Sequence, residues 1–137
     1  MKKLIIAAIL IAAFLVPAVG YAQQSTDKDI QTLRIQLILD SILWQYPDWA
    51  DKYEEHVFDC SEMTAYVQYV FAGYGVKSDY CQSDFLYHCW LRVGDIHIEC
   101  VELAIMDSPP VAPDIRYNRK MRADEVDWWN SILLGVK

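Results

Sequence analysis

Residues 58–63 read Phe-Asp-Cys-Ser-Glu-Met, and this stretch decides the fold of the chain around it. Asp59 is a residue type that caps helix N-termini, because its carboxylate accepts a hydrogen bond from an unpaired backbone N–H. Glu62 follows three residues later, which is the spacing of a capping box. Behind it, apolar residues recur every three or four positions, at Met63, Tyr66, Val67, Val70, Phe71 and Tyr74. We therefore expect a helix that begins at Cys60 and ends at the glycines of residues 73–75.

At the first position of this helix, Cys60 would meet the unpaired N–H groups and the helix dipole, both of which favour a thiolate. A nucleophilic cysteine is expected to have a pKa of about 3.5–7.5, against about 8.5 for a free thiol. The alternative is a structural role, because cysteine is also a common small buried residue and, in exported proteins, half of a disulfide. Position makes Cys60 a candidate nucleophile.

The N-terminus has the pattern of a secretory signal peptide. Two lysines precede an uncharged apolar run, which ends in small residues at Gly20 and Ala22. We expect cleavage after Ala22, so that residues 1–22 are the signal peptide and residues 23–137 form a single exported domain. The alternative is an uncleaved anchor, because residues 4–22 are long enough to span most of a bilayer.

Composition excludes several function classes. The chain has 137 residues and a formal charge of -7, and loss of two lysines with the leader makes the charge -9. Such an acidic product is unsuited to binding nucleic acid or an anionic membrane. No later segment is apolar enough to cross a membrane, so we expect no membrane contact after cleavage.

Elsewhere the patterns are less regular. A helix is predicted over residues 30–46, capped by Asp27 or Asp29 and ended by Pro47. One stripe of this helix comprises Ile30, Leu33, Leu37, Asp40 and Trp44, and a second group widens the apolar surface, Ile35, Ile38, Leu39 and Ile42. Residues 76–86 show no clear period, and three prolines make residues 106–114 a loop.

A closing helix over residues 124–134 places Val126, Trp129 and Leu133 on one side, away from Trp128.

Two alternating runs flank Gly94 and Asp95 and predict a β-hairpin, so the order of elements indicates an α+β fold. A two-residue turn there would pair residue 93 with residue 96 and place Trp90 opposite Glu99. Because side chains alternate, Glu99 then lies diagonal to His88 on one face of the hairpin. Glu102 would point the other way unless a bulge or longer turn shifts the register.

A cysteine at a helix start and a histidine–acid pair on neighbouring strands provide what acyl transfer requires, since the base activates the thiol and the acid orients the base. Asp-Cys-Ser at the start of a helix, then His-x-Trp on a strand and an acid on the next strand, resembles the transglutaminase-like cysteine hydrolases. The resemblance covers residues 57–103. Asp-Cys-Ser is shared with the NlpC-type cell-wall peptidases, which remain an alternative, but His-Cys-Trp at residues 88–90 favours the transglutaminase-like family.

The resemblance implies a small papain-like core, with N-terminal helices packed on an antiparallel sheet. It makes Cys60 the nucleophile, His88 the base and Glu99 the acid of an exported thiol-dependent hydrolase or acyltransferase acting on amide or peptide bonds. The chain departs from the family in the short spacing of 28 residues between Cys60 and His88, and in using Glu rather than the commoner Asp. The second oxyanion donor is not identified, and Tyr53 and His56 are the candidates.

The expected partner is a peptide or protein substrate, which export would place in the cell envelope. No cofactor or metal is expected, because the histidines and cysteines lack the short paired spacing of a metal site. If Cys60 is free, Cys81, Cys89 and Cys100 predict one disulfide and one buried thiol, with the pairing open. The alternative from another class is a secreted binding module in which Cys60 is disulfide-bonded or inactive.

Overall fold

The computed structural model describes residues 26–118 and 120–135, and the chain divides into two compact units, residues 1–35 and 36–137. The predicted signal peptide and its cleavage site therefore lie outside the described residues. In the first unit, residues 26–35 are helical. The predicted start at residue 30 is wrong, because Asp27 and Asp29 already lie inside the helix and cannot cap it. Among the described residues, no helix combines the length and hydropathy that a membrane crossing requires.

The second unit begins with helical residues 36–45, and the helix ends before Pro47, as the sequence predicts. Its buried side chains are Ile38, Leu39 and Ile42. The predicted stripe is wrong here, because Leu37 and Trp44 are exposed, Trp44 to 88%. A short 3-10 helix, η1 (Ala50–Lys52), follows.

Helix α2 (Cys60–Gly73) begins where the sequence predicts. The Asp59 side chain caps it by accepting a hydrogen bond of 2.8 Å from the Ser61 backbone N–H. Gly75 follows the helix with a φ of 69°, a left-handed conformation that favours glycine. The predicted apolar face is buried at Met63, Tyr66, Val67 and Phe71. Tyr74 is exposed instead, because the helix has ended before it.

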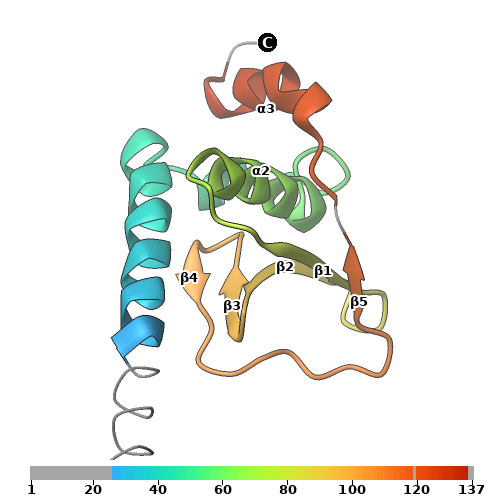
Figure 1. The fold of residues 1–137 in the computed structure, drawn as a ribbon. Coiled ribbons are helices and arrows are strands. Elements are labelled where there is room, and N and C mark those ends of the chain that lie inside the picture. The colour runs from blue at the N-terminus through green and yellow to red at the C-terminus, as the bar shows by residue number, and fades with distance from the viewer. Residues whose placement is uncertain (1–25, 119, 136–137) are drawn as a thin grey trace, which may run out of the picture. The chain divides into compact units, whose positions relative to one another are not determined.

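A five-stranded antiparallel sheet supplies the β part of this α+β fold, in the order β4-β3-β2-β1-β5 (Figure 1). The strands are β1 (Asp79–Ser83), β2 (His88–Val93), β3 (Ile96–Glu99), β4 (Ala104–Ile105) and β5 (Arg116–Asn118). The predicted hairpin is β2–β3, with the predicted register of Val93 opposite Ile96 and Arg92 opposite His97. Sequence periodicity missed β1, β4 and β5.

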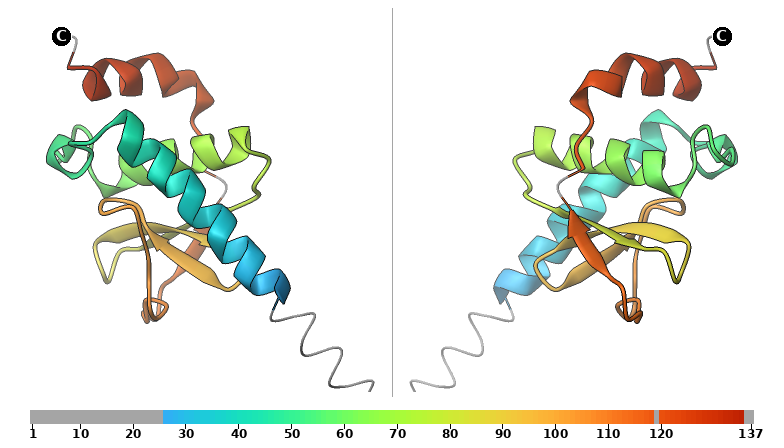
Figure 2. Two further views of the ribbon diagram at one scale, coloured as in Figure 1. Left: turned by 90° about the vertical axis from the view of Figure 1, so that its left-hand side faces the viewer. Right: turned by 90° about the vertical axis from the view of Figure 1, so that its right-hand side faces the viewer.

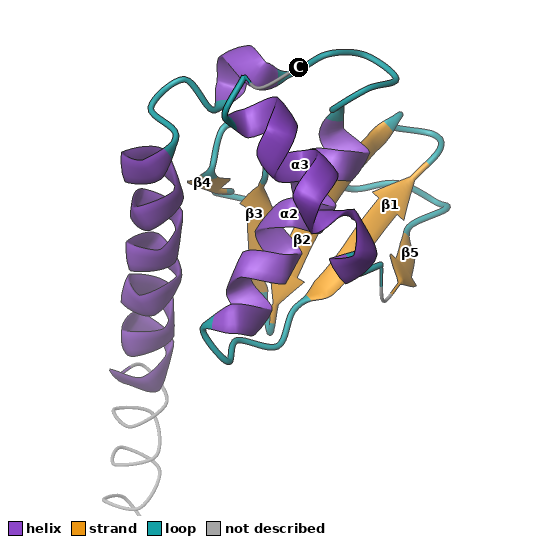
Figure 3. Cartoon of the chain, turned by 90° about the horizontal axis from the view of Figure 1, so that it is seen from above, coloured by secondary structure: helices purple, strands orange, loops and turns teal. Residues whose placement is uncertain are grey.

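Within the second unit, α2 lies between the sheet and the C-terminal helix (Figures 1 and 2). The view from above shows the C-terminal helix over α2 and α2 over the strands (Figure 3). This last helix, α3 (Val126–Leu133), follows a 3-10 turn, η2 (Ala123–Glu125). Trp129 and Leu133 are buried and Trp128 is largely exposed, as predicted. The Trp129 ring packs edge-on against Tyr66 of α2 at 5.7 Å.

Trp49 is the centre of an aromatic cluster that joins three parts of the second unit. Its side chain is fully buried and packs against Phe58, just before α2, and Tyr66, within α2, at ring-centroid distances of 5.9 and 5.6 Å. Its indole N–H donates a 2.9 Å hydrogen bond to the Cys100 carbonyl, which directly follows β3. One side chain therefore fixes the start of α2 relative to the end of β3.

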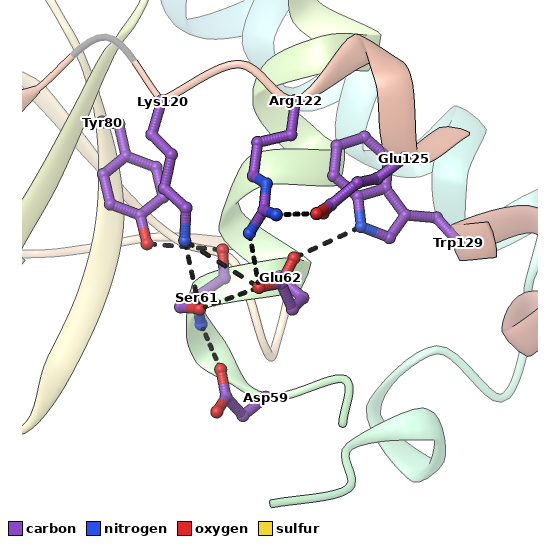
Figure 4. A network of polar contacts seen from close by, with 8 residues as sticks. All are labelled: Asp59, Ser61, Glu62, Tyr80, Lys120, Arg122, Glu125 and Trp129. Atoms are coloured by element: carbon purple, nitrogen blue, oxygen red, sulfur yellow. Dashed lines mark hydrogen bonds and ion pairs between the residues drawn. The ribbon is translucent and has the colours of Figure 1, made fainter. Parts of the chain in front are cut away.

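The Glu62 carboxylate ties the first turn of α2 to the C-terminal segment (Figure 4). It accepts hydrogen bonds of 3.4 Å from the Arg122 guanidinium and the Trp129 indole N–H, and Lys120 lies 3.9 Å away. The predicted capping box is therefore only half formed. Within its own helix Glu62 accepts a hydrogen bond of 3.4 Å from the Ser61 hydroxyl, and its other partners are cations and an indole donor from the C-terminal segment.

Glu62→Ala should lower the free energy of unfolding by about 1–3 kcal/mol, because Arg122 and Trp129 would lose a largely buried acceptor. Urea denaturation followed by circular dichroism measures the change. The control is Asp48→Ala, which removes the partner of Lys52 in an exposed ion pair and should have a much smaller effect. Equal effects of the two substitutions would contradict a structural role for the Glu62 network.

Candidate active site

Cys60 lines a pocket of about 380 Å³ at the start of α2. His88 and Cys89, the first two residues of β2, line the same pocket. The capping of α2 by Asp59 places Cys60 at the first helical position, and its side chain is partly exposed. The structure thus brings the predicted nucleophile and the predicted base to one opening at the surface.

The predicted base and acid are in direct contact. His88 Nε2 lies 2.6 Å from Glu99 Oε2, although the two residues are 11 positions apart in the sequence. The β2–β3 register makes this contact possible, because it places both side chains on the same face, diagonal to one another. The imidazole also stacks on the Trp90 ring at 6.1 Å and 14°. Trp90 in turn donates a hydrogen bond of 2.9 Å to His97 Nδ1, which gives His97 a supporting role.

The environment of Glu99 favours a carboxylate. Burial opposes ionisation, but the hydrogen bonds from His88 and from the Val101 N–H, at 3.0 Å, lower the pKa of Glu99 overall. Glu102 is exposed. The geometry therefore places Glu99 at the imidazole, as the hairpin register predicts.

The turn before His88 is fixed from a distant part of the chain. Asp114, in the proline-rich loop, accepts hydrogen bonds from the Ser83 hydroxyl at 2.6 Å and from the Asp84 and Phe85 N–H groups at 2.9 Å. The turn ends at Tyr87, whose φ of 49° is left-handed and strained for a tyrosine. His88 then enters β2 in a defined orientation.

Cys60 interacts with two side chains, those of Cys89 and His88. The Cys89 thiol and burial raise the pKa of Cys60, and His88 lowers it by a smaller amount. The expectation of a lowered pKa at Cys60 is therefore wrong, because the neighbouring Cys89 thiol favours the protonated form of Cys60. The interactions with Cys60 and Glu99 raise the pKa of His88 to about 9, so the imidazole is protonated at neutral pH.

Cys89 was not predicted to belong to the site. Its interactions with the Cys60 thiol and the Tyr80 hydroxyl lower its pKa despite burial, and the charge of Lys120 contributes. Lys120 lies over the Tyr80 ring at 5.3 Å and donates a 3.4 Å hydrogen bond to the Ser61 hydroxyl. The adjacency of Cys89 to His88 was the only signal in the sequence. Tyr80 and Lys120 gave none, since only tertiary folding brings them to Cys60.

All four cysteines are free thiols in this structure, so the predicted disulfide is absent. Strand β3 ends at Glu99, and Cys100 therefore does not pair with Cys89 across the hairpin. The Cys100 and Cys81 thiols instead approach the backbone carbonyls of Ile98 and Asp79, at 3.6 and 3.8 Å. Cys81 and Cys100 are buried.

Both oxyanion-donor candidates line the pocket. The pKa of Tyr53 is raised by burial and by the charge of Cys60, which places its hydroxyl in the field of the sulfur. His56 is 87% exposed at its side chain and lies 3.6 Å from Glu55. Both residues therefore stay candidates for the second oxyanion donor.

Within residues 26–118 and 120–135, no group of three or more His, Cys, Asp or Glu side chains is arranged to hold a metal ion. Comparison of the chain with protein-family models, curated proteins and solved structures finds no match. The functional conclusion therefore depends on the chemistry of the pocket itself.

The His88 imidazole should titrate near pH 9, which NMR of its ring protons measures directly. Because this folded-state pKa lies above the ordinary 6.5, the interactions of the imidazolium stabilise the fold fully below about pH 6.5 and are lost as the pH rises through 9. Glu99→Gln should move the titration toward 6.5, and the matched Glu102→Gln should leave it unchanged. An unshifted titration in Glu99→Gln would contradict this assignment.

Cys89→Ser should lower the pKa of Cys60, because it removes the largest cause of the increase. The pH dependence of Cys60 alkylation by iodoacetamide, followed by peptide mass spectrometry, measures this pKa. Cys81→Ser is the matched control, because Cys81 is also buried but does not line the pocket. The same alkylation profile in all three proteins would show that the two thiols are independent.

Proposed function

We propose that the protein is a thiol-dependent hydrolase of amide or peptide bonds, in which Cys60 is the nucleophile, His88 the acid–base group and Glu99 the residue that orients it. The observation that carries this proposal is the 2.6 Å contact between His88 Nε2 and Glu99 Oε2 in a pocket that Cys60 lines. Glu99 occupies Nε2, which leaves Nδ1 of the imidazole for Cys60. Cysteine, histidine and carboxylate thus follow one another in the order that acyl transfer needs.

We infer that the fold is a small papain-like core of the transglutaminase-like type. Support comes from a cysteine at the first position of a helix that packs on an antiparallel sheet, and from a histidine and an acid on adjacent strands of that sheet. The short spacing between Cys60 and His88 is accommodated because only α2, which Cys60 begins, β1 and two short connections separate them.

In the resting site, the imidazolium of His88 faces two thiols, of which Cys89 has the lowered pKa and Cys60 the raised one. When Cys89 is ionised, it takes the Cys60 proton, and the resulting Cys60 thiolate attacks the substrate carbonyl carbon and forms a C–S bond. The C–N bond then breaks, and His88 donates its proton to the leaving amine.

Water completes the cycle. Neutral His88 takes a proton from a water molecule, whose oxygen attacks the thioester and displaces the Cys60 sulfur. The Cys60 thiolate recovers its proton from Cys89, and all three groups return to their starting states. Attack by an amine in place of water would give an acyltransferase by the same steps.

The pocket walls suggest the class of substrate. Aromatic side chains at Tyr53 and Tyr87 and carboxylates at Glu55, Asp59 and Asp84 line it. Tyr87 is 91% exposed and stands at the rim. An open pocket with an aromatic and acidic lining suits a peptide or protein segment without strong negative charge. If the chain is exported, as its first 22 residues predict, envelope proteins or peptides are the proposed substrates.

With 4-nitrophenyl acetate as the acyl donor, the protein should acquire one acetyl group on Cys60 and release it to water, as measured by intact mass and peptide mapping. Glu99→Gln should slow acylation by about 10²–10⁴-fold, because the carboxylate no longer holds the imidazolium in place. Glu102→Gln should acylate at the wild-type rate, and circular dichroism verifies that each variant is folded. Acylation of another residue, or equal rates for the two variants, would overturn the proposal.

A further inference from the structure

The two cysteines of the pocket differ in their access to solvent. Cys60 is partly exposed at the start of α2, whereas only 5% of Cys89 is exposed. Both line the same pocket, and their thiols interact with one another. A reagent that enters from solvent therefore meets Cys60 first, and Cys89 is reached next through Cys60.

The surroundings of Cys89 favour a second nucleophilic sulfur. The Tyr80 hydroxyl interacts with it, and the ammonium group of Lys120 lies over the Tyr80 ring at 5.3 Å. The 3.2 Å hydrogen bond from the Thr64 hydroxyl to the Cys89 carbonyl holds this part of β2 against α2. A buried thiol with a lowered pKa that lines one pocket with a second, partly exposed thiol has the arrangement that thiol–disulfide exchange requires.

We propose that Cys60 and Cys89 form a reversible dithiol–disulfide couple, in which Cys60 reacts with an external low-molecular-weight disulfide and Cys89 resolves the resulting mixed disulfide. This activity is separate from the proposed hydrolysis, because it requires no acyl substrate. It assigns a redox function to a buried thiol that also raises the pKa of the nucleophile next to it.

The exchange balances with glutathione disulfide as the oxidant. The Cys60 thiolate attacks one glutathione sulfur, so that a Cys60–glutathione bond forms and one glutathione thiolate leaves. The Cys89 thiolate then attacks the Cys60 sulfur, which forms the Cys60–Cys89 bond and releases the second glutathione thiolate. The two leaving thiolates take up the two protons that the cysteines have lost. The protein is oxidised by two electrons and glutathione disulfide is reduced to two glutathione molecules.

The test is to incubate the reduced full chain with glutathione disulfide, quench with acid, alkylate the remaining thiols and measure intact mass. Chymotryptic mapping is suitable, because cleavage after Phe85 or Tyr87 separates Cys81 from Cys89. Wild-type protein should lose two hydrogens, give a linked pair of peptides containing Cys60 and Cys89, and recover its original mass with dithiothreitol. Cys89→Ser should stop at a Cys60–glutathione adduct.

The matched controls are Cys81→Ser and Cys100→Ser, which should form the same disulfide as wild type, because both residues are buried away from the pocket lining. A stable glutathione adduct on wild-type Cys60, or a disulfide that contains Cys81 or Cys100, would overturn the proposal. A chain that forms the Cys60–Cys89 bond but is never acylated at Cys60 supports the redox couple and contradicts the hydrolase proposal. The wild-type map decides the outcome even if one variant fails to fold.

Discussion

Burial of the Trp49 indole is the constraint on which the geometry of the pocket depends. Its ring packs against Phe58, two residues before Cys60, and its N–H binds the Cys100 carbonyl, one residue after Glu99. A buried indole N–H without an acceptor is costly, so the ring and the carbonyl constrain one another. Cys60 and Glu99 come from segments far apart in the sequence, and this side chain contacts both segments.

Local rules account for the parts of the candidate site that the sequence predicts. An N-cap acts over two or three residues, so Asp59 is sufficient to place Cys60 at a helix start. A two-residue turn fixes the register of a hairpin, and alternation then assigns His88 and Glu99 to one face. Both rules depend only on residues close in sequence, and the structure shows both the Asp59 cap and the predicted hairpin register. The predicted apolar stripe over residues 30–46 is wrong, because the second apolar group, Ile35, Ile38, Leu39 and Ile42, is buried instead.

What the sequence could not predict depends on contacts over long sequence distances. The Asp114 carboxylate orders the turn before His88 from about 30 residues away, and Glu62 binds side chains 60 and 67 positions later. Partners elsewhere in the sheet define strands β1, β4 and β5, rather than their own periodicity. Cys89 reaches Cys60 only because α2 packs on β2. No rule based on sequence spacing predicts that contact. The raised pKa of Cys60 and the lowered pKa of Cys89 therefore follow only from the folded structure.

The stack of His88 on Trp90 has an optical consequence. An imidazolium ring next to an excited indole accepts an electron and quenches its fluorescence, whereas a neutral imidazole does so only weakly. Trp90 is fully buried and lies parallel to the imidazole at 6.1 Å, so its emission is coupled to the charge on His88. The difference spectrum between the wild-type protein and a His88→Ala variant isolates this signal from the other tryptophans. The fold therefore contains its own spectroscopic reporter of the protonation state of the pocket.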